Sequence, residues 1–398
     1  MRFDSHYLMT KDDVIDYVFE HTDFFSSNEN LICEEIGDGN INYVYRITDT
    51  VANKSLILKQ ADVQTRVRPD GYLSTDRNAR EAEVLQTEYH FIPDLVPKVF
   101  YTDKTMAVII MEDIGSFCNL KKELMQGKIF LGLGTLLAGF IINTTFPMTE
   151  LILGNKKKLE AAFKFRNPEL CKITEDLVFT YPYYDIRKRN IVLPENKKWL
   201  ENNLHKKNII ARAAQLKQKF NNFQQSLIHG DLHSGSIFVK LQNNNLNIKI
   251  IDPEFAFYGP IAYDLGNVLA HLIFAEVYIK YTDNNLDPLQ KIDFLKWINR
   301  EKKYLFNVFT KEGIKFIKEN VCNSFYDNNI FIKQYIDEIK LDAVSFAGME
   351  LNRRVIGSAK TAEISTVKDI DIRIMLEREL VKRGINMMVN PDSFFKRG

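Results

Sequence analysis

The sequence predicts an α+β fold, with strands gathered in the first 115 residues and mainly helices in the rest of the chain. Segments 32–49 and 106–115 are alternating or continuous apolar runs next to turn-forming or polar residues, as strands are. Segments 287–313 and 329–357 place apolar residues at spacings of three and four, with charged residues on the opposite face, as helices do. A hairpin pattern within residues 227–264 interrupts the helical part.

The composition indicates a globular chain and excludes several classes of partner. Of the 398 residues, 45% are hydrophobic and 12% aromatic, which is enough for large buried cores. The 53 basic and 52 acidic residues leave a net charge of +1, which provides no field to attract nucleic acid or an anionic membrane. The four cysteines are scattered without a CxxC pair, so neither a zinc site nor a redox couple is expected.

An opening helix is predicted over residues 11–25, because Thr10 can cap it and Asp12 and Asp13 fall in its first turn. The charges at this end of the chain leave no apolar stretch of a signal peptide, so we expect a cytoplasmic protein. The most apolar segment, 129–146, is marginal for a bilayer span and lacks anchoring flanks. We expect it to form a buried helix.

The predicted strands of segment 32–49 are joined by a turn at Gly37, Asp38, Gly39 and Asn40. The glycines permit tight backbone geometry, so this turn can cover the phosphates of a nucleotide. Asp-Gly turns also join ordinary hairpins, and the motif alone favours that simpler interpretation. The next strand, 55–61, carries Lys59 among apolar residues, where a lysine needs a charged partner or a route to solvent.

Two carboxylates are predicted at the ends of short strands in the hairpin region. Asp231 follows an apolar run in LIHGD, so a loop carries it. Segments 236–241 and 247–252 predict a hairpin that places Asp252 at the tip of its second strand. HGD alone also fits a polar turn, but coupled to IDPE after the predicted hairpin it suits phosphoryl transfer. One carboxylate orients or deprotonates the attacking hydroxyl, and the other holds Mg²⁺.

The stretches HGDLHSGS, residues 229–236, and DPEFAFYGPIAYD, residues 252–264, resemble those of the 5-methylthioribose kinase family more closely than those of aminoglycoside and choline kinases. The resemblance covers nearly the whole chain. It implies a bilobal protein-kinase-like fold, with a small antiparallel-sheet lobe at 1–115 that binds nucleotide and a larger, mainly helical catalytic and substrate-binding lobe at 116–398. It also implies ATP-dependent phosphorylation of the 1-hydroxyl of 5-methylthioribose in methionine salvage, with ATP and Mg²⁺ as cofactors and a homodimer as the assembly.

The same resemblance assigns the nucleotide contacts. Lys59 and the turn at 37–40 would hold the phosphates, and a glutamate on the following helix would pair with the lysine. Glu81 and Glu83 are both available, and the spacing to the next strand favours Glu83.

A second set of implied nucleotide contacts lies where segment 106–115 leads from the small lobe into the large one. Met111 would contact the face of the adenine, and backbone groups of Glu112 to Ile114 would bond its edge. Packing at the end of a strand accounts for these residue types equally well.

The metal ligands are expected to differ from those of the related kinases, which have Asn five residues after the catalytic Asp. Ser236 occupies that position here, and Glu254 adds a carboxylate two residues after Asp252. Serine is a shorter and neutral ligand, so Asp252 and Glu254 are expected to provide most of the Mg²⁺ coordination. His229 and His233 are interpreted as braces for the catalytic loop.

Arg353 and Arg354 stand in the sequence RRVIG. On a solvated helix two neighbouring side chains would point about 100° apart and bind nothing together. In 5-methylthioribose kinases an Arg-Arg pair followed by two aliphatic residues and Gly contacts the sugar hydroxyls, which implies the same substrate-binding role here. Asp264 resembles the acid that braces the catalytic loop.

Two other functions stay open at this point. The chain could phosphorylate another small alcohol, such as an aminoglycoside, choline or a different sugar, or it could be a non-catalytic scaffold with a kinase fold. The presence of Lys59, Asp231, Asp252 and Glu254 weighs against a scaffold, which usually lacks one of these groups.

Overall fold

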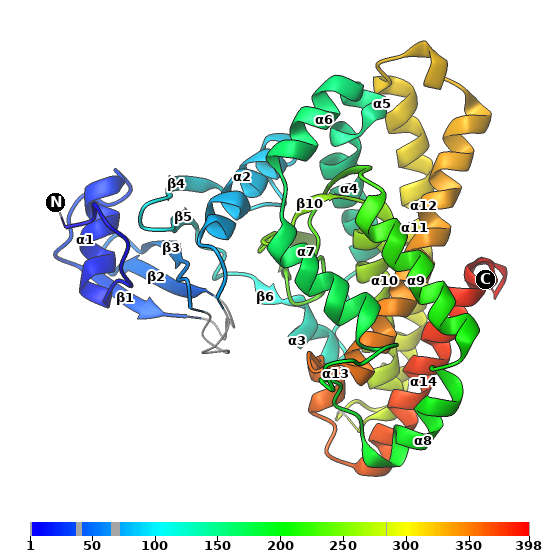
Figure 1. Ribbon diagram of the computed structural model, residues 1–398. Helices are drawn as coiled ribbons and strands as arrows, with labels where there is room; N and C mark the ends of the chain where they lie inside the picture. Colours follow the sequence, from blue (N-terminus) through cyan, green and yellow to red (C-terminus); the bar gives the residue numbers. More distant parts are fainter. Residues whose placement is uncertain (1, 37–41, 65–71, 284, 398) are drawn as a thin grey trace. The chain divides into compact units, whose positions relative to one another are not determined.

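The computed structural model describes residues 2–36, 42–64, 72–283 and 285–397, and the chain divides into two units (Figure 1). The sheet unit comprises residues 1–117 and 249–254, and the helical unit comprises residues 118–248 and 255–398. The turn that carries Asp252 and Glu254 therefore belongs to the sheet unit, whereas the loop that carries Asp231 belongs to the helical unit.

The sheet unit is built on a five-stranded antiparallel sheet with strand order β1-β2-β3-β5-β4. Its helices are α1 (Lys11–His21) and α2 (Asp76–Phe91), of which α1 packs on β1 and α2 packs on β4 and β5. Its strands are β1 (Leu31–Glu35), β2 (Tyr43–Asp49), β3 (Lys54–Gln60), β4 (Val99–Asp103) and β5 (Val108–Glu112). The strand β3 that carries Lys59 is central and pairs with β2 and β5.

The predicted opening helix exists but ends earlier than expected. Thr10 caps α1, because its side chain accepts a hydrogen bond from Asp13 N–H while the Asp13 carboxylate accepts one from Thr10 N–H. The helix ends at His21, since Thr22 is extended. Phe25, which the prediction placed in the helix, instead joins the apolar core beneath α1.

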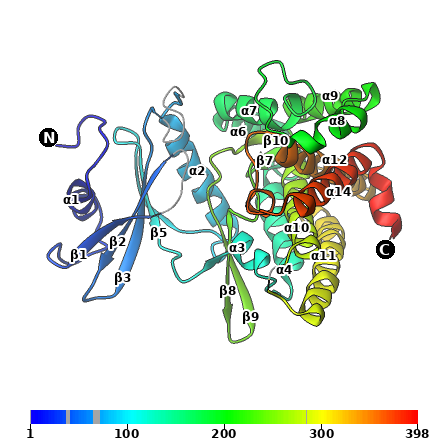
Figure 2. The ribbon, with the colours of Figure 1, turned by 90° about the horizontal axis from the view of Figure 1, so that it is seen from below.

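Helices make up most of the helical unit, and α10, α12 and α14 pack against one another at its centre (Figures 1 and 2). The longer helices are α4 (Leu133–Thr145), α6 (Asn155–Lys164), α8 (Pro194–Asn203), α9 (Lys207–Asn222), α10 (Ile261–Tyr281), α11 (Pro288–Asn320), α12 (Asn329–Ile356) and α14 (Ile370–Val389). The shorter ones are α3 (Leu120–Met125), α5 (Glu150–Leu153), α7 (Pro168–Thr174), α13 (Ala362–Ser365), η1 (Phe146–Met148), the π-helical turn η2 (Glu175–Thr180), η3 (Ser324–Tyr326) and η4 (Pro391–Arg397).

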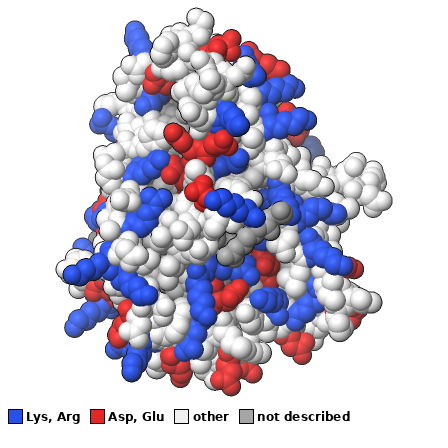
Figure 3. Space-filling view, turned by 90° about the vertical axis from the view of Figure 1, so that its right-hand side faces the viewer, with Lys and Arg blue, Asp and Glu red and all other residues white. Residues whose placement is uncertain are grey.

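The two helices predicted from apolar spacing are confirmed as α11 and α12, and the apolar segment 129–146 contains the buried helix α4. Asp287 caps α11 through hydrogen bonds from Leu289 N–H and Gln290 N–H. Within the described residues, none of the helices is both long and apolar enough to cross a membrane. Basic and acidic side chains both occur on the face shown in Figure 3.

The predicted hairpin is formed by β8 (Ile237–Gln242) and β9 (Asn245–Ile250), which lie side by side (Figure 2). Its two-residue loop, Asn243 and Asn244, has positive φ angles of 52° and 63°, which suit the turn that two-residue hairpins favour. The short strand β6 (Cys118–Asn119) pairs with β8, and β7 (Ser226–Ile228) pairs with β10 (Phe257–Gly259). Strand β9 ends at Ile250, so Asp252 lies two residues beyond the strand tip.

Candidate active site

The buried lysine of the sheet unit pairs with two carboxylates. Lys59 lies opposite Val44 and Ile109 in the sheet, and its side chain is 8% exposed. Its Nζ lies 2.7 Å from Glu81 Oε2 and also donates to Asp252 Oδ1. A lysine among apolar strand residues therefore has the charged partners that its burial requires.

The preference for Glu83 as the helix partner of Lys59 is wrong, because Glu81 takes this place. Two residues along an α-helix differ in direction by about 200°, so both side chains cannot face the same strand. Glu81 is 1% exposed and shares the buried face of α2 with Arg77 and Leu85, whereas Glu83 is only half-buried. Spacing along the sequence does not fix this helical phase, because the phase depends on packing against the sheet.

Three carboxylates gather beside Lys59. One oxygen from each of Glu81, Asp252 and Glu254 lies within 4.8 Å of the others. Burial, followed by the neighbouring Asp252, raises the pKa of Glu254 to about 8, and burial raises the pKa of Glu81 to about 7. Lys59 and Arg77 both lower these pKa values, but less than burial raises them. The cluster therefore offers converging oxygen donors of the kind that suit a divalent cation.

Two side chains that the sequence analysis did not single out hold Glu254. Asn42 Nδ2 donates to Glu254 Oε2 at 3.2 Å, and Arg77 Nη2 donates to Asn42 Oδ1 at 2.9 Å. Asn42 and Arg77 are both almost fully buried. The only sequence signal for Asn42 was its place just after the predicted turn at 37–40, and Arg77 reads as an ordinary helix residue.

The other predicted nucleotide contacts are only partly described. Gly37, Asp38, Gly39 and Asn40 lie outside the described residues. Met111 is 8% exposed on β5, and the N–H of Glu112 donates to the carbonyl of Lys98 at 2.8 Å. The carbonyl of Ile114 accepts from Phe117 N–H at 2.8 Å. The Glu112 N–H is therefore committed to the protein, and the remaining adenine contacts stay predictions.

In the helical unit, Asp264 holds the loop that carries Asp231. Asp264 lies in the first turn of α10 and accepts from His229 N–H at 2.7 Å and from Gly230 N–H at 3.0 Å. It is 1% exposed, and this burial raises its pKa to about 7, although the two N–H donors act in the opposite direction. The pairing of β7 with β10 fixes the start of the same loop.

Gly230 precedes Asp231 in a conformation that few other residues tolerate. Its φ is +80°, and a Cβ at this position would lie 2.2 Å from the carbonyl oxygen of Phe255. We expect Gly230→Ala to lower the free energy of unfolding by about 2–4 kcal/mol, because it adds a backbone clash to the cost of the left-handed conformation. Urea denaturation of both proteins measures this change.

Gly132→Ala is the matched control for Gly230→Ala. Gly132 has a φ of +85°, but a Cβ there would meet nothing within 4 Å. Its replacement should therefore cost only the conformational part, about 1–2 kcal/mol. Equal losses for the two variants would show that the contact with Phe255 is readily relieved.

The Asp231 carboxylate lies beside His233 of its own loop. Asp231 Oδ2 is 3.4 Å from His233 Nε2, and the Asp231 N–H donates to His229 Nδ1 at 3.3 Å. Burial would raise the pKa of Asp231, but His233, Arg354 and Arg353 hold it below its usual range. The carboxylate is therefore ionised at neutral pH and can accept a hydrogen bond from an alcohol.

Ser236 makes two hydrogen bonds within the loop that carries Asp231. Its hydroxyl donates to the carbonyl of Asp231 at 3.3 Å, and its N–H donates to His233 Nδ1 at 3.1 Å. Gly235 N–H reaches the same nitrogen at 3.0 Å. The histidine thus braces the loop in the way its sequence position indicated. Metal binding by Ser236, which is 4% exposed, stays a prediction.

Arg353 and Arg354 share one buried carboxylate near the end of α12. Arg353 Nε donates to Glu350 Oε2 at 2.5 Å, and Arg354 Nε donates to Glu350 Oε1 at 2.7 Å. The side chains of Arg353 and Glu350 are 9% and 1% exposed. The pair is therefore not the solvated helix surface that the residue types alone would favour, and both guanidinium groups act electrostatically on Asp231.

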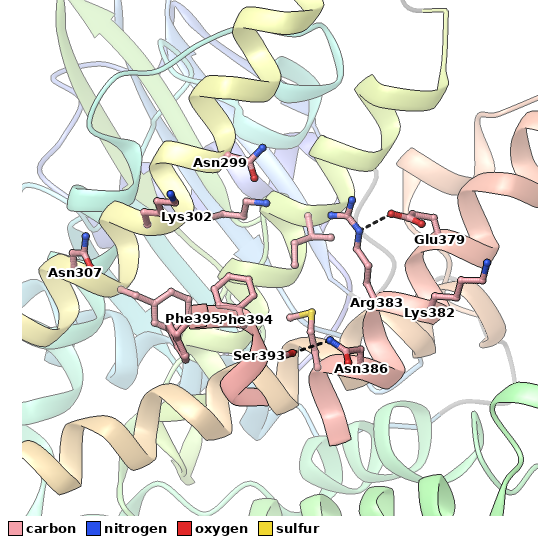
Figure 4. Close-up of a pocket in the computed structure, with 14 residues that line it drawn as sticks. Asn299, Lys302, Asn307, Glu379, Lys382, Arg383, Asn386, Ser393, Phe394 and Phe395 are labelled. Carbon is pink, nitrogen blue, oxygen red and sulfur yellow. Dashed lines mark hydrogen bonds and ion pairs between the residues drawn. The ribbon is translucent and has the colours of Figure 1, made fainter. Parts of the chain in front are cut away.

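A cavity of about 720 Å³ lies elsewhere in the helical unit, between α11, α14 and η4 (Figure 4). Two of its cations have carboxylate partners: Lys302 and Arg383 both bond Glu276, and Arg383 Nε donates to Glu379 at 2.9 Å. Phe394 and Phe395 close one side (Figure 4). None of the predicted site residues is among the described residues that line it, so it does not belong to the phosphotransfer site.

Residues 166–288, which include the Asp231 loop and the turn at 252–254, match the phosphotransferase enzyme family. This match agrees with the chemistry of the carboxylates around Lys59 and of the loop that carries Asp231. The protein is therefore a small-molecule kinase. The predicted kinase-like fold, with a small antiparallel sheet and a larger helical part, is confirmed.

The comparison with whole relatives is more specific. The chain is 33% identical to a methylthioribose kinase of Geobacillus thermodenitrificans, over 92% of this chain and 88% of that one. It is 34% identical to a methylthioribose kinase of Bacillus cereus, over 96% of this chain and 92% of that one. The chain belongs to the methylthioribose kinase family, as the stretches at 229–236 and 252–264 predicted. A solved ethanolamine kinase from Plasmodium vivax is similar at 11% identity with a TM-score of 0.47, over 97% of this chain and 90% of that one.

Proposed function

We propose that this chain transfers the γ-phosphoryl group of ATP to the 1-hydroxyl of 5-methylthioribose, a reaction of methionine salvage. Membership of the methylthioribose kinase family supports the choice of methylthioribose as the acceptor. The observation that carries the proposal is the pair Arg353 and Arg354, held by the buried Glu350 in the same unit as the Asp231 loop. In this proposal residues 1–115 bind the nucleotide and residues 116–398 bind the acceptor.

In the proposed mechanism the sheet unit binds the phosphates of ATP. Lys59 donates to them from β3, and Glu81 fixes the direction of the lysine side chain. The oxygens of Asp252 and Glu254 would hold Mg²⁺, because they are hard donors that converge in one cluster. When bound, this ion supplies a positive charge against the phosphate oxygens. Asn42 and Arg77 keep Glu254 in position.

Asp231 is proposed to orient the acceptor hydroxyl rather than to act as a strong base. Its pKa is held below the usual range, so the carboxylate accepts the hydroxyl hydrogen bond in its ionised form. Phosphoryl transfer through a loose transition state needs little proton removal before the bond to phosphorus forms. The helical unit therefore has two tasks in this mechanism. Asp231 orients the acceptor hydroxyl, and the two arginines hold the sugar.

A panel of acceptors with ATP tests the proposal directly. Methylthioribose should be phosphorylated, while choline, ethanolamine and aminoglycosides should give little product at the same concentration. Phosphorus NMR of the product places the new phosphate on the 1-oxygen. Preference for another alcohol would show that the protein is a kinase of that alcohol instead. Complete inactivity would favour a non-catalytic scaffold.

Replacement of Arg353 or Arg354 by Lys is expected to lower kcat/KM for methylthioribose by about 1.5–3 kcal/mol, the scale of a hydrogen bond to a charged group. A guanidinium presents a planar fork of donors that an ammonium cannot copy. The KM for ATP should change little. Steady-state kinetics with each substrate varied in turn measures both quantities.

Arg383→Lys is the matched control for these variants. Arg383 also bonds a buried carboxylate of the helical unit, but it lies at the cavity of Figure 4. Its replacement should leave the kinetics of methylthioribose unchanged. If the Arg353 and Arg354 variants behave like this control, the two arginines do not bind the acceptor.

We further propose that the protein is a cytoplasmic homodimer, as the family resemblance implies. Light scattering of the purified full chain should give twice the monomer mass of 46.3 kDa. A monomer that is fully active would rule out this assembly as a requirement of the reaction.

A further inference from the structure

Glu350 occupies the centre of a polar cluster that joins α12 to α10. It is 1% exposed, and α10 and α12 pack against each other along their lengths (Figure 1). Burial would raise the pKa of Glu350, but Arg353, Arg354 and His271 hold it well below its usual range. A carboxylate this deeply buried is costly unless its charge is matched, and here two guanidinium groups match it.

Glu350 binds the same nitrogen, Nε, on each arginine. Among the described residues it accepts no hydrogen bond from the terminal nitrogens of either guanidinium group. Arg354 Nη1 makes one further hydrogen bond, to the carbonyl of Ala359 at 3.3 Å, and Arg353 has no other hydrogen-bond partner among the described residues. The bond from Nε to Glu350 fixes the direction of the Arg353 guanidinium, whose terminal nitrogens can donate to hydroxyl oxygens.

A second contact chain runs from Glu350 to the Asp231 loop. Glu350 Oε1 lies 3.6 Å from His271 Nε2, and His271 Nδ1 lies 3.0 Å from Ser234 Oγ. Burial lowers the pKa of His271 to about 3, so the ring is neutral and its two nitrogens take opposite hydrogen-bonding roles. Its Nδ1 can accept from the hydroxyl of Ser234, three residues after Asp231, while Nε2 faces the Glu350 carboxylate at 3.6 Å, beyond hydrogen-bond distance.

We propose that Glu350 is a positioning residue for phosphoryl transfer, which holds Arg353 and Arg354 from behind and ties them through His271 and Ser234 to the loop that carries Asp231. The inference rests on the proposed function, because it assumes that the two arginines bind the acceptor. In this proposal the Glu350 carboxylate fixes the two arginines that hold the sugar. It also fixes the loop whose Asp231 orients the sugar hydroxyl. Loss of its charge should misplace the acceptor relative to Asp231 while leaving nucleotide binding intact.

Glu350→Gln tests this role with little change of shape. The amide keeps one acceptor oxygen but turns an NH₂ group toward one guanidinium, so one arginine loses its partner. We expect the KM for methylthioribose to rise about 10- to 100-fold, the scale of one charge-assisted hydrogen bond lost at the binding site. The KM for ATP should stay within about twofold of the parent value, because the arginine forks do not bind nucleotide.

Glu276→Gln is the control for loss of stability. Glu276 is likewise a buried carboxylate that bonds two cations, Lys302 and Arg383, but it lies twelve residues beyond Asp264 along α10, or about 18 Å. Both variants should lower the midpoint of thermal unfolding, whereas only Glu350→Gln should raise the KM for methylthioribose. Equal kinetic effects of the two variants would reduce Glu350 to a structural residue and overturn the proposal.

A combined variant separates positioning from general damage. If Glu350 acts through the two arginines, Glu350→Gln added to the double variant Arg353→Lys, Arg354→Lys should lower kcat/KM no further than the arginine changes alone. Full additivity of the two losses would show that the residues act independently, against the proposal. A parent protein that ignores methylthioribose would instead refute the proposed function. The same variants would then be compared on the acceptor identified by the panel, where an unchanged KM in Glu350→Gln overturns the positioning role.

Discussion

Asp231→Asn is expected to lower turnover by about 10²- to 10⁴-fold, the usual scale for a positioned acid-base group. The amide keeps the shape of the side chain but loses the ionised oxygen that His233, Arg354 and Arg353 stabilise. The attacking hydroxyl then has no carboxylate to direct its hydrogen bond. Single-turnover measurements with saturating ATP isolate this loss from product release.

The fold of this variant should be preserved, because the loop is held by Asp264 and His233 rather than by the Asp231 carboxylate. Nucleotide affinity, measured by titration calorimetry, should match that of the parent. Asp337→Asn is a suitable control, since Asp337 is half-buried and, within the described part of the chain, pairs with Lys340 on its own helix. Near-normal turnover of Asp231→Asn would remove Asp231 from the mechanism.

Features that depend on neighbours in sequence could be predicted from the sequence alone. The cap of α1 by Thr10 follows from local hydrogen bonding. The hairpin of β8 and β9 follows from alternation around Asn243 and Asn244, which tolerate the positive φ angles of its loop. The placement of Asp252 and Glu254 in one turn follows from their separation by a single residue.

Features that depend on packing could not be predicted in this way. The choice between Glu81 and Glu83 is set by which face of α2 meets the sheet, and spacing along the chain does not report it. Glu350 precedes Arg353 and Arg354 by three and four residues, a pattern that usually marks a weak ion pair on a helix surface. The packing of α12 in the helical unit buries this group, and its contact with α10 brings His271 to it.

Glu254→Gln is expected to damage Mg²⁺-dependent activity more than Ser236→Ala does. Glu254 is 7% exposed and lies in the carboxylate cluster with Glu81 and Asp252, whereas the Ser236 hydroxyl donates to the carbonyl of Asp231. Removal of one anionic oxygen from the cluster lowers its attraction for a divalent cation. The Mg²⁺ concentration for half-maximal rate should therefore rise at least about tenfold, since even outer partners of metal ligands cost that much.

Titration of the rate against Mg²⁺ at fixed ATP compares the two variants, and Mg²⁺ binding measured by calorimetry without acceptor gives a readout independent of turnover. Asp103→Asn serves as the control in the sheet unit, because Asp103 accepts from Tyr17 and lies outside the cluster. It should lower stability without changing the Mg²⁺ requirement. If Ser236→Ala raises the requirement more than Glu254→Gln, the hydroxyl is the stronger ligand, and the metal must be held from the Asp231 loop rather than by the carboxylate pair.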